Sequence, residues 1–314
     1  MDDTEIQGLT GSGPIVPARH EFSGSVWHYT DAAGLAGIAA GGPDQTGCLW
    51  ATAATMLNDP DELRYGAERV TEWFERAGNA EAGSSGAHLA IRTALSHLPE
   101  RILRDPAYVV CASTDGDALG QWRGYAGAGG YAVQLDTRHE YTIVGRPDPD
   151  VTFSLAPAWV KVAYTPDEQA TLIQSVFDYI LDSSTVVGRL VAMDDAESAS
   201  KIVEGLLAGL AAALKHPSFI EEKEVRLIAF LPPGGRPKFR GNNRGVIPYM
   251  ELTTAIFANV AYPPRTFPIP IQGVRIGPPR GDAMDQRRAG VAALLRATGR
   301  GALPINGSEI PFLP

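Results

Sequence analysis

The order of strand-like and helix-like segments constrains the fold of this chain more than any other feature. Short runs typical of strands dominate both ends of the sequence, among them residues 24–30, 48–53, 108–113, 131–135 and 222–230. Helix-like segments are grouped in the middle, where Thr165-Pro166-Asp167-Glu168 forms a capping box that predicts the start of a helix. Because strands and helices do not alternate regularly, the pattern indicates an α+β fold rather than a parallel βαβ sheet.

The length of the chain, 314 residues, supports either one large domain or two small ones. Residues 1–20 are polar and contain glycine and proline, so we predict a flexible lead-in there. Residues 21–314 are predicted to form a single domain with a helical insertion at about 165–215.

The charge balance excludes some classes of partner. The 36 acidic and 27 basic residues give a net charge of −9, which disfavours broad nucleic-acid binding because recognition of a phosphate backbone needs a basic surface. The acidic N-terminus is unlike a signal peptide, and no apolar run approaches the ~18 residues of a membrane span. We therefore expect a cytoplasmic protein without membrane contact; an effector exported by a dedicated secretion machine would have the same pattern.

Several common sites have no counterpart in the sequence. Cys48 and Cys111, the only cysteines, lie in apolar strand-like runs, so we predict free buried thiols. Neither cysteine has the spacing of metal ligands and no His-x-x-x-His pair occurs, so no metal site is predicted. Gly-x-Gly-x-x-Gly, P-loop and Gly-x-Ser-x-Gly motifs are also missing.

The first strand carries a candidate ligand-binding pair. In Trp27-His28-Tyr29-Thr30, the period of two places His28 and Thr30 on one face and Tyr29 on the other. The pair has two interpretations. It can be satisfied inside a core, or it can bind a ribose or a phosphate, because both side chains donate and accept hydrogen bonds.

A late strand carries two candidate catalytic acids. Glu222 and Glu224 share one face at a period of two, before the firmly strand-like run that ends at Phe230. In one interpretation these charges form a solvated edge where Arg226 pairs with Glu224. In the other, both carboxylates face a cleft, hold a ribose hydroxyl and stabilise positive charge that develops on a sugar ring.

Other polar and aromatic residues are weaker candidates. Asn58 precedes Asp59 and Glu62, which a helix cap explains, and Asn58 is left as a possible group of an active loop. Trp122 and Tyr125 can belong to a core or can stack on a planar ring, and Arg123 can hold a phosphate or a carboxylate. The long loop predicted at 232–244 carries a basic cluster that we interpret as solvated, with steering of an anionic ligand as the alternative. The cluster is Arg236, Lys238, Arg240 and Arg244.

Five short motifs in order resemble a bacterial family known only as a domain of unknown function. The resemblance covers about residues 25–313. Its motifs are His28-Tyr29-Thr30, Asn58-Asp59-Pro60-Asp61-Glu62, Ser113 with Trp122-Arg123-Gly124-Tyr125, Glu222-Lys223-Glu224-Val225-Arg226, and Ser308-Glu309-Ile310-Pro311-Phe312.

That family more distantly resembles the ADP-ribosyltransferase superfamily. The resemblance implies a split antiparallel β-sheet core with helical insertions. It also implies that NAD is the substrate, that His28 and Thr30 bind its ribose with Tyr29 as a further NAD-binding residue, and that Glu224, preceded by Glu222, is the catalytic acid. The aromatic residue that stacks on nicotinamide is sought first at Trp50, with Trp122 and Tyr125 as rivals.

The expected function is therefore NAD-dependent ADP-ribosyl transfer to an unknown acceptor, or NAD hydrolysis, in a bacterial toxin or defence effector. One alternative is a non-catalytic module of the same fold that senses a nucleotide or binds a protein. A second alternative is a carboxylate-based hydrolase of another nucleoside or glycoside.

Overall fold

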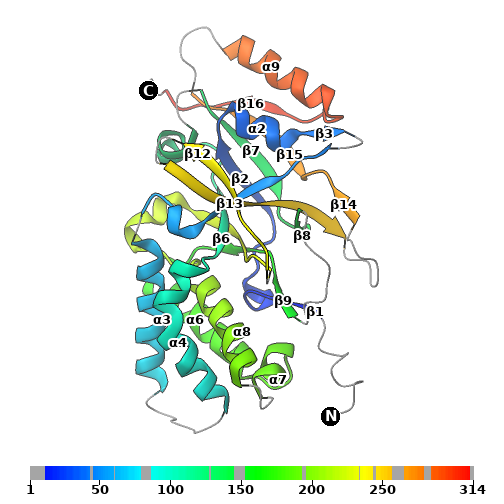
Figure 1. The fold of residues 1–314 in the computed structure, drawn as a ribbon. Coiled ribbons are helices and arrows are strands. Elements are labelled where there is room, and N and C mark those ends of the chain that lie inside the picture. Colours follow the sequence, from blue (N-terminus) through cyan, green and yellow to red (C-terminus); the bar gives the residue numbers. More distant parts are fainter. Residues whose placement is uncertain are drawn as a thin grey trace.

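The computed structural model describes residues 11–42, 45–59, 61–78, 86–126, 129–144, 153–192, 196–232, 234–242, 245–256, 265–278 and 284–311. In these residues, helices and one large, mostly antiparallel open sheet form a mixed fold (Figure 1). The expected α+β class is confirmed at this level. Among the described helices, none combines the length and the apolar composition that crossing a bilayer demands.

The main sheet has the strand order β12-β13-β5-β6-β2-β7-β15-β16. Strands β10 and β11 extend it from β6, and β8 and β14 pair with β13. All described pairs in this sheet are antiparallel except β15 with β16. The strands are β2 (Ser25–Thr30), β5 (Leu49–Ala53), β6 (Tyr108–Ser113), β7 (Tyr131–Asp136), β8 (Tyr141–Ile143), β10 (Ala158–Lys161), β11 (Glu224–Ala229), β12 (Lys238–Asn242), β13 (Gly245–Ile256), β14 (Arg265–Phe267), β15 (Ile271–Ile276) and β16 (Ile305–Gly307).

The sheet splits at β6. One edge of β6 pairs with β11 along its whole length. The other edge pairs with β5 at Tyr108 and Val109, and with β2 at Ser113. Residues 110–112 lie between these two contacts and pair with neither β2 nor β5. Strands β2 and β5 therefore separate along this edge and leave part of the β6 backbone facing the space between them.

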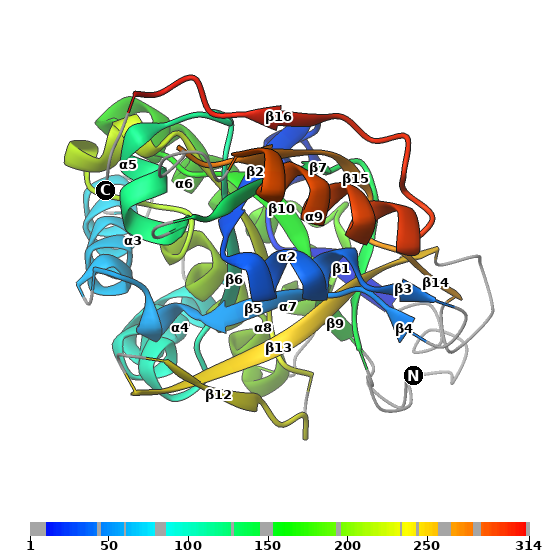
Figure 2. The ribbon, with the colours of Figure 1, turned by 90° about the horizontal axis from the view of Figure 1, so that it is seen from above.

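The helices form two groups on opposite sides of the sheet (Figures 1 and 2). The larger group buries an apolar core that includes Val70, Ile91, Phe177 and Leu207. The smaller group covers a second core that includes Leu35 and Leu295. The first group is α3 (Glu62–Gly78), α4 (Gly86–Arg104), α6 (Pro166–Leu181), α7 (Val186–Ala192) and α8 (Ala196–Ala211), and the second is α2 (Ala32–Ala39) and α9 (Met284–Ala297).

The predicted capping box starts α6 as expected. The Thr165 hydroxyl accepts a hydrogen bond from the Glu168 backbone N–H at 3.2 Å, and the Glu168 carboxylate accepts one from the Thr165 N–H at 3.1 Å. We expect Thr165→Ala to lower the free energy of unfolding by about 1 kcal/mol, because it leaves helix N–H groups without their acceptor. Denaturant unfolding measures this loss.

Thr171→Ala is the matched control, because it makes the same change on an exposed position inside the same helix. Alanine is the better helix former there, so stability should stay equal or rise slightly. Equal destabilisation by both variants would contradict the capping role.

The second half of the predicted lead-in differs from the expectation, and residues 1–10 lie outside the described residues. Residues 11–20 form β1 (Gly11–Pro14), which pairs in parallel with β9 (Phe153–Ala156), and a short turn of helix, Ala18–His20. Ile15 and Val16 are fully buried, and Ile15 lies against Gly209 of α8. Residues 11–20 are ordered because burial of this apolar pair stabilises the segment more than the surrounding glycine and proline residues disfavour regular structure.

Candidate functional site

A cavity of about 700 Å³ lies where the sheet splits. Its wall combines β2, β5, β6 with its unpaired stretch, α2, the π-helical turn η3 (Trp122–Ala126), the end of the 3₁₀ turn η4 (Pro217–Glu222), the start of β11, β12 and β13. This volume is typical of small-molecule sites. Of the predicted site residues, the cavity is lined by His28, Tyr29, Thr30, Trp50, Asn58, Tyr125, Glu222 and Glu224.

His28 is held by the split itself. Its Nδ1 lies 2.8 Å from the Cys111 carbonyl oxygen on the unpaired stretch of β6. A carbonyl can only accept, so Nδ1 carries the proton and Nε2 remains an acceptor. Burial lowers the pKa of His28, and the nearby charge of Arg240 lowers it further, so the ring is neutral at neutral pH. A neutral Nε2 can accept a hydrogen bond from a ligand hydroxyl.

Thr30 lies at the end of β2, where the chain enters α2. Asp31 caps this helix by accepting a hydrogen bond from the Gly34 N–H at 2.7 Å. A Cβ on Gly34 would lie 1.9 Å from the Thr30 hydroxyl oxygen, so only glycine leaves room for this rotamer. The close approach keeps a hydroxyl at the cavity wall beside His28.

Glu224 also lines the cavity, but its carboxylate is bound by two neighbouring cations. Arg226 donates from Nε to Oε1 at 2.8 Å and from Nη2 to Oε2 at 2.7 Å, and Lys215 Nζ lies 3.1 Å from Oε2. Burial opposes ionisation, but Arg226 and Lys215 outweigh it and hold the pKa of Glu224 below its usual value. The pairing with Arg226 that the sequence suggested is correct, but the pair is buried rather than solvated.

Glu222 is the more accessible carboxylate. Its side chain is 25% exposed, against 4% for Glu224. Lys215 Nζ donates to Glu222 Oε2 at 2.6 Å. Burial raises the pKa of Glu222, although Lys215 opposes this shift. Of the two predicted catalytic acids, Glu222 is therefore the one placed to meet a ligand.

Two further charged residues contact Glu222, Glu224 or Arg226, and the sequence did not predict this role for either of them. Glu62 was expected to cap α3, but it is 3% exposed, and its carboxylate contacts Lys215 at 3.2 Å and Arg226. Lys215 was not singled out, although a lysine at the end of the apolar run 206–214 requires an acidic partner when buried. We call Glu62, Lys215, Glu222, Glu224 and Arg226 the ion cluster.

The candidate aromatic residues differ in their exposure and in whether they line the cavity. Trp122 is 2% exposed, does not line the cavity and donates from Nε1 to Asp117 at 2.8 Å, so of its two interpretations the structure favours the core residue. Its ring packs edge-to-face against the Tyr29 ring, with 4.7 Å between the ring centroids. Trp50 is 42% exposed and Tyr125 is 38% exposed, and both line the cavity. These two residues remain the candidates for stacking.

Tyr29 holds the segment in front of η3. Its hydroxyl donates to the Asp115 carbonyl at 2.8 Å and accepts from the Ala118 N–H at 3.0 Å. Only 6% of the residue is exposed, although Tyr29 belongs to the cavity lining. A contact between Tyr29 and a ligand stays a prediction.

The C-terminal motif secures the same segment. Asp117 accepts hydrogen bonds from the Ser308 hydroxyl at 2.6 Å and from the Glu309 N–H at 2.8 Å. Arg275 also contacts Asp117, at 3.2 Å. The motif thus orients η3 without reaching the cavity lining; Phe312 lies outside the described residues.

The remaining residues that the sequence singled out are two polar side chains at the surface and the two cysteines. Asn58 is exposed at the cavity wall, and Arg123 is exposed and outside the lining. Cys48 and Cys111 are free, as expected, and burial raises the pKa of both thiols. Within the described ranges, no group of three His, Cys, Asp or Glu side chains is arranged to hold a metal ion.

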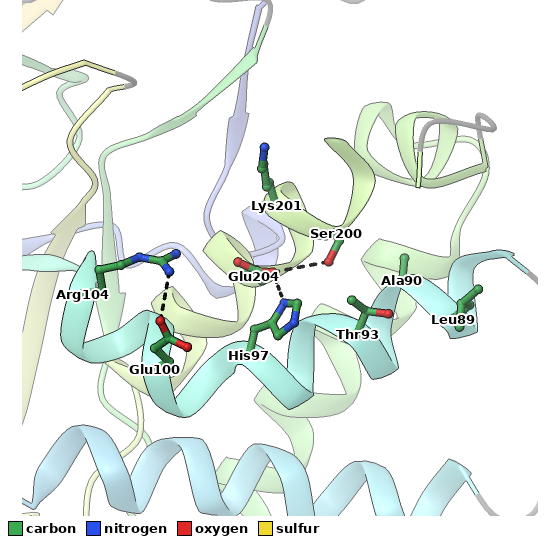
Figure 3. A pocket seen from close by; sticks show the side chains of 9 residues that line it. All are labelled: Leu89, Ala90, Thr93, His97, Glu100, Arg104, Ser200, Lys201 and Glu204. Atoms are coloured by element: carbon green, nitrogen blue, oxygen red, sulfur yellow. Dashed lines mark hydrogen bonds and ion pairs between the residues drawn. The ribbon is translucent and has the colours of Figure 1, made fainter. Parts of the chain in front are cut away.

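A second cavity, of about 570 Å³, lies between α4 and α8 (Figure 3). Glu204 is its central acid: His97 Nδ1 lies 2.9 Å from Glu204 Oε1, and the Ser200 hydroxyl lies 3.4 Å from the same oxygen. A serine nucleophile needs the histidine in direct contact with its hydroxyl. Here both residues contact one carboxylate oxygen instead, so this cavity does not have the arrangement for serine-based hydrolysis.

Residues 121–227 match a family described as "Protein of unknown function (DUF2971)". The predicted relationship to a domain of unknown function is confirmed for this interval. The matched interval includes Trp122-Arg123-Gly124-Tyr125 and the Glu222–Arg226 motif, whereas His28 and Asn58 lie before it. No curated protein and no solved structure matches the chain.

Proposed function

We propose that the cavity at the sheet split binds NAD and cleaves its nicotinamide–ribose bond, for ADP-ribosyl transfer to an acceptor or for hydrolysis. The observation that carries the proposal is the convergence of His28 and Thr30, from β2, and Glu222, from η4, on one cavity. The resemblance to ADP-ribosyltransferases, in which a histidine of the first strand binds a ribose of NAD and a glutamate of a late strand holds the nicotinamide ribose, supports NAD as the ligand.

The cavity supplies groups suited to each part of this reaction. Neutral His28 and the Thr30 hydroxyl offer hydrogen bonds to a ribose. Trp50 or Tyr125 can stack on a planar ring. Departure of nicotinamide leaves positive charge on the ribose, and the Glu222 carboxylate can stabilise that charge more strongly than it stabilises the ground state.

Glu222 rather than Glu224 takes the leading role in this proposal. The Glu224 carboxylate already accepts hydrogen bonds from Arg226 and Lys215 on both of its oxygens, and a ligand would have to break these buried contacts to reach it. Glu224 instead fixes Lys215, and Lys215 in turn orients Glu222. Glu224 is therefore a positioning residue.

The engagement of Glu224 also favours a second candidate function, a non-catalytic module that binds a nucleotide in the same cavity. Incubation of the protein with NAD distinguishes the two candidates. The enzyme releases nicotinamide in amounts that grow with time and with protein concentration, with or without an added acceptor.

Two outcomes would contradict the catalytic proposal. The first is saturable binding of ADP-ribose without nicotinamide release by the same preparation, which would support the nucleotide-binding module. The second is the absence of both release and binding, which would remove NAD as the ligand.

A further inference from the structure

Arg240 is a cation in the cavity wall, and among the described residues no carboxylate forms a direct ion pair with it. Its Nη2 donates to the Thr52 hydroxyl at 2.8 Å. The guanidinium carbon lies 5.2 Å from the centre of the Trp50 ring and 5.6 Å from that of Tyr249. These contacts hold the guanidinium at the cavity without neutralising it.

The neighbouring cation on β12, by contrast, has an acidic partner. Within the described part of the chain, no carboxylate forms an ion pair with Arg240 at 4.0 Å or less. Lys238, two residues earlier on β12, contacts Glu251 at 2.6 Å. Asp31 also lines the cavity, but its carboxylate caps α2. A half-buried arginine without an acidic partner is suited to bind an anion from outside the protein.

Two parts of the cavity wall carry opposite charge. Arg240, on β12, faces the cavity beside the β5 wall of Trp50 and Thr52. The ion cluster, with three carboxylates and two cations, presents Glu222 from the η4 side. A ligand with an anionic group at one end and a developing cation at the other fits this polarity.

We propose that Arg240 binds the phosphate groups of a nucleoside diphosphate ligand, with Thr52 and Trp50 holding its guanidinium in place. The inference rests on the proposed function for the identity of the ligand, and it extends that function by setting the direction in which the dinucleotide lies. The diphosphate lies at Arg240, and the nicotinamide-bearing ribose lies towards Glu222.

The test compares ADP-ribose with adenosine by calorimetric titration. Arg240→Gln should weaken ADP-ribose binding about tenfold to a hundredfold, because hydrogen bonds to charged groups are lost, and should leave adenosine binding unchanged. Arg236→Gln is the matched control: it removes the same charge from an exposed position outside the cavity lining. Thermal unfolding verifies that both variants fold.

A measurement on the wild-type protein does not depend on how the variants fold. Inorganic pyrophosphate should displace ADP-ribose, and adenosine should bind at least tenfold more weakly than ADP-ribose. Equal affinity for adenosine and ADP-ribose, or equal losses in Arg240→Gln and Arg236→Gln, would overturn the assignment of Arg240.

Failure of this inference can be separated from failure of the proposed function. Binding of ADP-ribose that depends on Arg240, without nicotinamide release, would sink the catalytic proposal and support the phosphate site. Nicotinamide release with the same KM for NAD in the wild type and in Arg240→Gln would support the catalytic proposal and overturn the phosphate site at Arg240.

Discussion

Arg226→Met should lower the free energy of unfolding by about 3–5 kcal/mol, the usual cost of removing one partner from a buried ion pair. Arg226 is 1% exposed, and its guanidinium contacts Glu224 and Glu62. It also donates to the Ala212 carbonyl at 2.7 Å, which links β11 to the end of α8. The variant therefore leaves two buried carboxylates with Lys215 as their remaining cation.

Urea unfolding followed by circular dichroism measures this loss. Lys223→Met is the matched control, because it removes one positive charge from an exposed pair in which Lys223 lies 3.1 Å from Asp115. Surface pairs contribute about 0–1 kcal/mol, so this control should remain close to the wild type. A loss of stability in Arg226→Met no larger than in Lys223→Met would contradict the role of the ion cluster.

A double variant tests whether unpaired charge causes the loss. Arg226→Met with Glu224→Leu removes one charge of each sign, so the net charge of the ion cluster returns to its original value. We expect the double variant to be more stable than Arg226→Met alone, because fewer buried carboxylates lack a partner. If the two substitutions destabilise additively, lost packing rather than charge dominates.

The stability that the ion cluster contributes should fall as the pH falls. Arg226 and Lys215 lower the folded-state pKa of Glu224, so its stabilising contribution is present above the ordinary glutamate pKa of ~4.3 and is lost as the pH falls. In Arg226→Met, burial is less opposed and the same carboxyl is easier to protonate. The stability gap between wild type and variant should therefore narrow on acidification from pH 7 towards pH 4.

Local sequence patterns predicted the parts of the fold that depend on neighbouring residues. The Thr165–Glu168 capping box starts a helix, because its hydrogen bonds join residues three apart. The period of two in Trp27-His28-Tyr29-Thr30 separates Tyr29 from His28, since a strand turns successive side chains to opposite faces. His28 indeed bonds to Cys111, whereas Tyr29 bonds to Asp115.

Features that depend on distant segments were not predictable in this way. The ion cluster brings Glu62 and Lys215 together across more than a hundred residues, and no short pattern records that contact. Capping residues alone explained Glu62 adequately, so its burial left no sequence signal. Likewise, the spacing of Trp122 and Tyr125 does not reveal which ring is buried, because their exposure depends on how η3 meets β2.

Glu222→Gln should lower the rate of nicotinamide release by on the order of 10²–10³, the usual effect of removing a preorganised charge that stabilises a transition state. Glutamine keeps the shape of the side chain and can still meet Lys215, but it cannot neutralise positive charge on the ribose. The effect should appear in kcat more than in KM for NAD, since the charge develops only as nicotinamide leaves.

The neighbouring residue provides the matched control. Glu221→Gln makes the same chemical change at an exposed position outside the cavity lining, and it should leave kcat unchanged. Stability separates a catalytic loss from a folding loss. Burial raises the folded-state pKa of Glu222, so ionised Glu222 does not stabilise the fold near pH 7, and Glu222→Gln should unfold at a denaturant concentration close to that of the wild type.

Glu224→Gln completes the comparison. It removes a charge two residues further along the chain, at the start of β11, but Glu224 acts through Arg226 and Lys215. Its first effect should therefore be a loss of stability like that of Arg226→Met. A folded Glu222→Gln with undiminished kcat would show that Glu222 is not the catalytic acid. Loss of kcat in Glu224→Gln without loss of stability would assign that role to Glu224 instead.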